Sequence, residues 1–230
     1  MLYPNSSVVT KNRFFQCFIL SSPTTQNAPI KNILTANYST ELETAAFGKF
    51  SAFTYNNSVA KASDLRRTAE NLGLNSFIPL EINGQHKILW HIHGTAMKPK
   101  SVVMGHYYYG KLLREIEEYV PHLIRRYQVA KKSDDKSLQI KSWVDYFLMS
   151  DLHIVGFSMD PAEMDLWWML CCKKRNFPDT EVFFYEPNNM SINRSEKELL
   201  LKAYGVNIVT EEAFNGNYKK YYYESIRGIR

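Results

Sequence analysis

Residues 89–94 read LWHIHG, an apolar run that carries two histidines and then stops at a glycine. A neutral imidazole at a strand end can take a proton from an attacking nucleophile, which makes His93 a candidate general base. On an extended strand His91 and His93 would share one face, as a metal pair would, but no third ligand is evident and no metal site is predicted. The structural alternative for His93 is a strand-end histidine bound to a backbone carbonyl.

Two further turns carry polar residues after an apolar run. Residues 35–39 read TANYS and residues 156–160 read GFSMD. Ligands of open parallel sheets bind at the carboxyl ends of the strands, so neighbouring strands would bring these turns and the LWHIHG turn to one cleft. There Gly94 and Gly156 would let the backbone approach a ligand closely. Asn37, in the first of these turns, is equally well explained as a turn-forming residue.

The strands and helices that position these turns have their clearest sequence patterns in the second half of the chain. Helices are predicted to begin near Asp160 and Ser195, between buried strands over residues 152–157, 181–186 and 206–209. This alternation of strand and helix predicts parallel strands joined by right-handed crossovers.

The first of these helices carries a capping pattern. Asp160 would cap it, Pro161 would lie in its first turn, and Glu163 would complete a capping box. Its sequence DLWWMLCC is apolar almost all round, which predicts a buried helix. A helix start attracts phosphate, although the charge of Asp160 opposes an anion there. Capping is therefore favoured over catalysis for Asp160 and Glu163.

The first half of the chain is less regular. Strands are expected over residues 31–37 and 87–94, and helices from about Thr40, over 63–73, and near 110–127 and 139–150. The expected fold class is α/β: a Rossmann-like three-layer sandwich with a parallel sheet and a helical insertion. We expect a single domain over residues 1–230, with the insertion at about 105–150 and a tail at about 211–230.

Composition excludes several classes of protein. The formal charge of +5 is modest, so the mixtures of tyrosine and basic residues in GHYYYGK and near the C-terminus predict a solvated surface rather than nucleic-acid binding. Three cysteines without a C-x-x-C pair indicate neither a disulfide framework nor a zinc ribbon. With no secretory leader and no long apolar segment evident, the expected location is cytoplasmic and no membrane contact is expected.

The motifs NILTANYSTELE, HIHG and IVGFSMDPAEMD, in this order, resemble the sirtuin-like family. The similarity is greatest to its bacterial branch that acts in anti-phage defence. The resemblance implies NAD as substrate or ligand, and cleavage of its nicotinamide–ribose bond by a glycohydrolase-type reaction. It also implies that His93 is the general base and that Asn37 orients the ribose or a water. The cofactor-contacting residues that it implies are Thr35, Asn37, Gly94, Gly156, Ser158 and Asp160.

The chain also departs from the family pattern. The family opens with a glycine-rich phosphate loop, whereas the first glycine here is Gly48. Ser39 stands where relatives usually carry aspartate, and the absent zinc ribbon argues against peptide deacylation. Two hypotheses follow: an NAD-cleaving enzyme in anti-phage defence, or a non-catalytic, truncated sirtuin-like module for binding or assembly. The expected partners are NAD or a related nucleotide, a second copy of the chain, or a defence partner protein.

Overall fold

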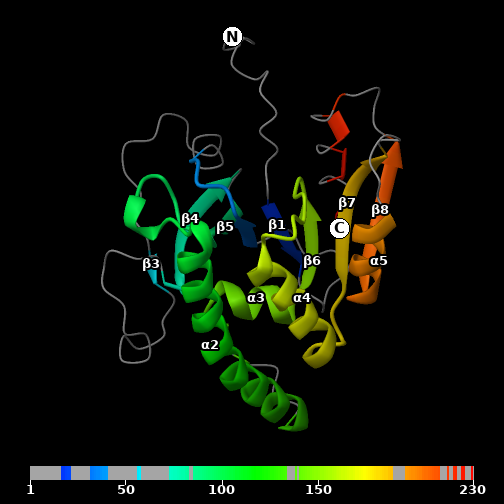
Figure 1. The fold of residues 1–230 in the computed structure, drawn as a ribbon. Helices are drawn as coiled ribbons and strands as arrows, with labels where there is room; N and C mark the ends of the chain where they lie inside the picture. Colours follow the sequence, from blue (N-terminus) through cyan, green and yellow to red (C-terminus); the bar gives the residue numbers. More distant parts are fainter. Residues whose placement is uncertain are drawn as a thin grey trace.

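A computed structural model describes most of the second half of the chain and parts of the first (Figure 1). The described residues are 17–21, 32–40, 56–57, 73–82, 85–133, 138, 140–188, 195–212, 217, 220–221, 224–225 and 229. The strands are β1 (Cys17–Ser21), β2 (Asn32–Thr35), β3 (Asn56–Asn57), β4 (Ser76–Ile82), β5 (Gln85–His91), β6 (Asp151–Val155), β7 (Val182–Asn188) and β8 (Val206–Glu212). The helices are α2 (Gly105–Ser133), α3 (Trp143–Met149), α4 (Met164–Asn176), α5 (Ser195–Ala203) and the 3-10 turn η2 (Pro99–Ser101).

The described strands form one sheet of eight, in the order β3-β4-β5-β2-β1-β6-β7-β8. Strands β2 and β5 are parallel, and so are β6, β7 and β8. Strand β1 is antiparallel to both β2 and β6, and β4 is antiparallel to β5. The predicted parallel sheet is therefore confirmed for these two parallel groups only, because β1 between them and β4 beside β5 make the sheet mixed.

The second half of the chain folds in the predicted order. Strand β6 leads through α4 to β7, and β7 leads through α5 to β8. The strands align with Leu152 opposite Val182, and Val182 opposite Val206. All three side chains are buried. Crossover helices cover the faces of parallel sheets, so the strands of such sheets carry apolar residues. Two crossovers of the same hand along neighbouring strands place α4 and α5 on the same face of the sheet.

Helices α2, α3 and α4 contact one another and lie in front of the sheet in Figure 1. Helix α4 buries Leu166, Met169 and Leu170, as expected for its apolar sequence. Helix α2 buries one stripe, including Ile116 and Leu123, and its other residues are half-buried or exposed. This pattern is that of a helix packed on one side. Among the described residues, none of the helices has the length and apolar character needed to cross a bilayer.

A buried lysine links α3 to α4. The amine of Lys173 donates hydrogen bonds to the carbonyls of Phe147 (3.0 Å), Leu148 (3.0 Å) and Ser150 (2.6 Å) at the end of α3. The last carbonyls of a helix have no intrahelical partner, so this amine supplies the donors that they lack. Lys173 is only 2% exposed, and burial lowers its pKa to about 7.

Two helices of the first half stay predictions. The segment from about Thr40 and residues 63–73 lie largely outside the described residues. The helices predicted near 110–127 and 139–150 correspond to α2 and α3. The architecture is thus a mixed α/β fold consistent with a Rossmann-like arrangement. The second helical layer of the predicted three-layer sandwich stays a prediction.

Candidate active site at the sheet edge

The ends of β2, β5 and β6 lie at one edge of the sheet. Thr35 aligns with His91 across the parallel pair β2 and β5. Cys17 of β1 aligns with Thr35 on one side and with Val155 on the other. The segments that follow Thr35, His91 and Val155 therefore start from the same edge, as predicted for the three polar turns. The ordinary position for a ligand in such sheets is this edge.

The turn after β2 is bound to the loop after β5. The carbonyl of Tyr38 accepts hydrogen bonds from the backbone N–H of Ala96 (2.8 Å) and the hydroxyl of Thr95 (3.3 Å). The Tyr38 hydroxyl donates to the carbonyl of Val103 at 2.6 Å. Nδ1 of His91 donates to the carbonyl of Asn37 at 3.1 Å. The two segments therefore form one hydrogen-bonded unit.

The loop after β5 holds His93 outside the strand. Strand β5 ends at His91, and His93 lies in the turn that follows. The backbone N–H of Val103 donates to the His93 carbonyl at 2.9 Å. Gly94 has φ +85°, and a Cβ there would overlap the backbone carbonyl of Ser101. The expectation that both histidines share a strand face is wrong, because the chain turns before His93.

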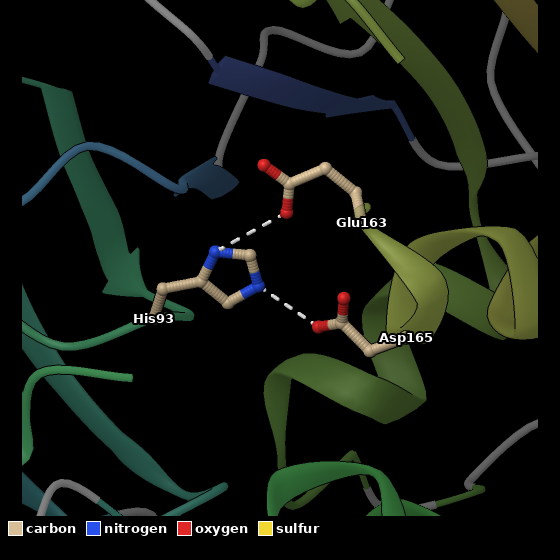
Figure 2. A group of neighbouring side chains, drawn as sticks. All are labelled: His93, Glu163 and Asp165. Atoms are coloured by element: carbon tan, nitrogen blue, oxygen red, sulfur yellow. Dashed lines mark hydrogen bonds and ion pairs between the residues drawn. The ribbon is translucent and has the colours of Figure 1, made fainter. Parts of the chain in front are cut away.

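The imidazole of His93 lies between two carboxylates from the start of α4 (Figure 2). Its Nε2 is 2.8 Å from Oδ2 of Asp165, and its Nδ1 is 3.8 Å from Oε2 of Glu163. His93 and Asp165 are each 1% exposed, whereas the side chain of Glu163 is 19% exposed. If Nε2 carries a proton, it donates that proton to Asp165. Nδ1, on the side of Glu163, is then the nitrogen with a lone pair.

Two tyrosines complete the cluster. The Tyr109 hydroxyl donates to Oε2 of Glu163 at 3.2 Å, and its ring meets that of His93 edge to face. Burial and the neighbouring Glu163 raise the pKa of Tyr109, so it stays protonated at neutral pH. Burial also raises the pKa of Tyr38. The pKa of Glu163 is raised by burial and by repulsion from Asp165, against a lowering effect of His93. The cluster is rich in acidic groups.

The predicted capping box is wrong. Helix α4 begins at Met164, and its N-cap Glu163 makes no side-chain capping hydrogen bond. Asp160 instead accepts a hydrogen bond from the backbone N–H of Ala162 at 2.8 Å, and its carbonyl accepts one from Glu163 N–H at 3.0 Å. These bonds close a turn before the helix. Because the helix starts later than predicted, the carboxylate of Glu163 faces His93 rather than the helix end.

The other predicted site residues follow the same three strands. Thr35 is fully buried and accepts a hydrogen bond from the backbone N–H of Asn37 at 3.1 Å, while Asn37 itself is half-buried. Gly156 follows β6 with φ +69°. Ser158 is exposed, and its carbonyl accepts a hydrogen bond from the amine of Lys197 at 3.3 Å. Asp160 is exposed as well.

A small cavity lies beside the cluster but is separate from it. Its volume is about 60 Å³, and its lining includes His91, Gly94 and Ser101. None of Asn37, His93 and Ser158 lines it. The predicted cleft shared by these three residues stays a prediction.

Sequence reasoning missed Asp165 and assigned Glu163 to capping. One signal could have identified Asp165: an aspartate at the start of a helix that is apolar almost all round has to find a buried partner. The identity of that partner could not be inferred from the local sequence, because His93 lies 72 residues earlier in the chain. Tyr109 gave no signal distinct from that of the adjacent tyrosines in GHYYYGK.

The comparisons with known proteins concern the same part of the chain. Residues 31–209 match the family model of the SIR2-like domain. No match was found among curated proteins, and none among solved structures. The matched segment starts just before β2, ends within β8, and contains the whole His93 cluster. Because it covers well over half of the 230 residues, the chain belongs to the SIR2-like domain family.

Proposed function

We propose that this chain binds NAD at the edge formed by the ends of β2, β5 and β6, and hydrolyses its nicotinamide–ribose bond. Membership of the SIR2-like family supports an NAD-related function. One observation carries the choice of reaction: His93 is held at 2.8 Å by Asp165, with its other nitrogen facing Glu163. A histidine oriented by a carboxylate is the usual arrangement of a general base.

The proposed reaction uses both the imidazole of His93 and the two carboxylates beside it. As the bond from the ribose carbon to nicotinamide breaks, that carbon gains oxocarbenium character, as in sugar hydrolysis. The carboxylates of Glu163 and Asp165 favour the positive charge that moves from the pyridinium ring to the ribose as the bond breaks. A water then adds to the ribose carbon and passes a proton to His93. The products are nicotinamide, ADP-ribose and one proton.

Asn37 is proposed to orient the ribose or the attacking water, and its backbone is suited to that task. Its N–H is bonded to Thr35 and its carbonyl to His91, so the position of its Cα is fixed from both sides. Thr35, Gly94, Gly156, Ser158 and Asp160 are proposed to contact the nucleotide from the same three strand ends.

Nucleotide binding should be weak. The sequence contains no glycine-rich loop in its first 40 residues. A charge-assisted hydrogen bond contributes about 1.5–3 kcal/mol, so losing two donors to the pyrophosphate weakens binding by roughly two to four orders of magnitude. We therefore expect slow turnover and a KM in the millimolar range.

The test is release of nicotinamide from NAD, followed by chromatography. His93→Ala should abolish turnover with its circular dichroism spectrum unchanged. The matched control is His122→Ala, which removes an exposed histidine from α2 and should leave the rate unaffected. Turnover that persists in His93→Ala would refute the assigned base.

The second candidate is a non-catalytic module that binds a nucleotide or a partner protein. The burial of His93, 1% exposed, favours it, because a base must reach its substrate. Under this hypothesis NAD is not cleaved even at millimolar concentration. Nicotinamide release above the level of His93→Ala would exclude it.

A role in anti-phage defence, alone or with a defence partner protein, is proposed from the resemblance to the bacterial branch of the family. Cells that express the wild-type chain should survive phage challenge better than cells that express His93→Ala. Equal survival at equal expression would contradict a defence role for the reaction.

A further inference from the structure

The His93 cluster offers the ligand set of a metal site. One nitrogen of His93 and one oxygen from each of Glu163 and Asp165 lie within 4.8 Å of one another (Figure 2). Zinc accepts imidazole nitrogen together with carboxylate oxygen, and manganese accepts carboxylates readily. Calcium and magnesium prefer sets of oxygen ligands alone, so they fit this cluster less well.

An unsatisfied oxygen separates this cluster from an ordinary group of acidic residues. Oδ2 of Asp165 contacts His93, but Oδ1 is buried and has no hydrogen-bond partner within the described part of the chain. A buried polar atom left without a partner is costly, and more so when it carries charge. A cation bound at Asp165 would remove this cost.

The ligands come from two well-fixed segments. Glu163 is the N-cap of α4 and Asp165 lies in the first turn of that helix. His93 belongs to the loop that Val103 and Tyr38 hold against the turn after β2. The Glu163 side of the cluster is partly exposed, which provides a path for the ion and for water ligands.

The distances between the three candidate ligands are such that an ion could bind after movement of side chains alone. Ligands about 2.0–2.2 Å from a tetrahedral zinc lie roughly 3.3–3.6 Å apart. The distance from Nε2 of His93 to Asp165 is 2.8 Å and that from Nδ1 to Glu163 is 3.8 Å, so the two distances lie on either side of this range. They involve different nitrogens of His93, so one carboxylate must swing towards the nitrogen that binds the ion. Glu163, with its longer and partly exposed side chain, can do so.

We propose that His93, Glu163 and Asp165 bind one divalent cation of the zinc or manganese type. The ion replaces the proton between the imidazole and Asp165, and water fills its remaining positions. With the ion on Nε2, the neutral imidazole carries its proton on Nδ1, the nitrogen that acts as base in the proposed reaction, so the metal-bound state and the state with His93 as base are alternatives. The proposal does not depend on NAD cleavage.

The test is calorimetric titration of the full chain, freed of metal with a chelator, with zinc chloride and with manganese chloride in the absence of nucleotide. One ion should bind per chain. Replacing second-shell residues already costs 10–100-fold in affinity, so Glu163→Gln and Asp165→Asn should each weaken binding by roughly tenfold or more. Glu118→Gln is the matched control, because it removes an exposed carboxylate from α2 and should bind as the wild type does.

Two results would overturn the proposal. The first is an absence of saturable binding to the wild type. The second is wild-type affinity in Glu163→Gln, which would place the ion on other groups such as Cys171 or Cys172. If Asp165→Asn fails to fold by circular dichroism, Glu163→Gln decides the question alone. Failure of NAD turnover would leave this titration unaffected, so the two proposals are tested separately.

Discussion

His93 takes its chemical character from two residues that lie beyond it in the sequence. Asp165 fixes the ring through Nε2, and Glu163 approaches the opposite nitrogen. The motif HIHG identified the histidine, but only the fold brought the carboxylates to it. At this scale the resemblance to the sirtuin-like family is confirmed by the family match, whereas the roles of single residues stay proposals.

Asp165→Asn tests whether that carboxylate positions the base. An amide cannot hold the imidazole in the same way, and it favours the positive charge of the transition state less. We expect kcat for NAD cleavage to fall by about 10²–10⁴-fold, the usual contribution of acid–base catalysis, with little change in KM. Steady-state kinetics measure both constants. A raised KM with kcat unchanged would instead assign Asp165 to binding alone.

Gly94→Ala tests the loop that carries His93. The new Cβ would overlap the Ser101 carbonyl, and φ +85° is unfavourable for alanine. We expect a loss of roughly 2–4 kcal/mol in the free energy of unfolding, measured with denaturant. The control is Gly110→Ala within α2, where a Cβ meets no atom and alanine should stabilise the helix by about 0.5–1 kcal/mol. A loss no larger than in the control would contradict the described loop.

At the scale of elements, the contact between α3 and α4 depends on one amine. Lys173→Met keeps the aliphatic stem but leaves the carbonyls of Phe147, Leu148 and Ser150 without this donor. We expect the free energy of unfolding to fall by roughly 2–4 kcal/mol. The adjacent Lys174→Met removes an exposed amine and should cost far less. Equal losses in the two variants would refute the linking role of Lys173.

The same lysine should make stability depend on pH. Its folded pKa of about 7 lies below the ordinary lysine value of 10.5, because burial outweighs the attraction of Asp151. Between these values the unfolded chain holds a proton that the folded chain lacks, so unfolding becomes harder as pH rises. The slope is at most about 1.4 kcal/mol per pH unit. The difference in unfolding free energy between wild type and Lys173→Met should therefore grow from pH 7 to pH 9. A difference that stays constant over this range would contradict the lowered pKa of Lys173.

Local patterns predicted some elements and missed others for identifiable reasons. The strands and helices between β6 and β8 have apolar runs bounded by clear breaks, and the structure contains them. The pairing of β4 with β5 was missed, although Asn83 and Gly84 stand between two apolar runs, which is a strong hairpin signal. The start of α4 was placed too early because Asp160 fits a cap and a turn equally well.

At the scale of the whole molecule, the direction of β1 could not be predicted. Nothing in the run Cys17–Ser21 encodes whether it pairs parallel or antiparallel with β2 and β6, since the alternation of side chains along a strand is the same in both directions. Its antiparallel course puts Ser21 opposite Asp151, at the edge away from His93. A segment leaving the end of β1 therefore starts far from the candidate site. A phosphate loop following this strand would not begin at the candidate site.

The site is assembled across the sheet rather than between adjacent strands. Strands β2 and β1 separate β5 from β6, yet the segments that follow β5 and β6 meet where His93 contacts Glu163 and Asp165. That meeting point lies at the edge where ligands bind in open sheets. We propose that NAD binds there, against the imidazole of His93.

Histidine-selective nitrogen NMR tests this claim most directly, because it detects millimolar binding and does not require turnover. His93→Ala assigns the resonance, and exposed His122 serves as the internal control. Adding NAD should shift the ring nitrogen signals of His93 in a saturable manner and leave those of His122 unchanged. Saturable shifts confined to other histidines, or no shift at any NAD concentration up to solubility, would contradict an NAD site at this cluster.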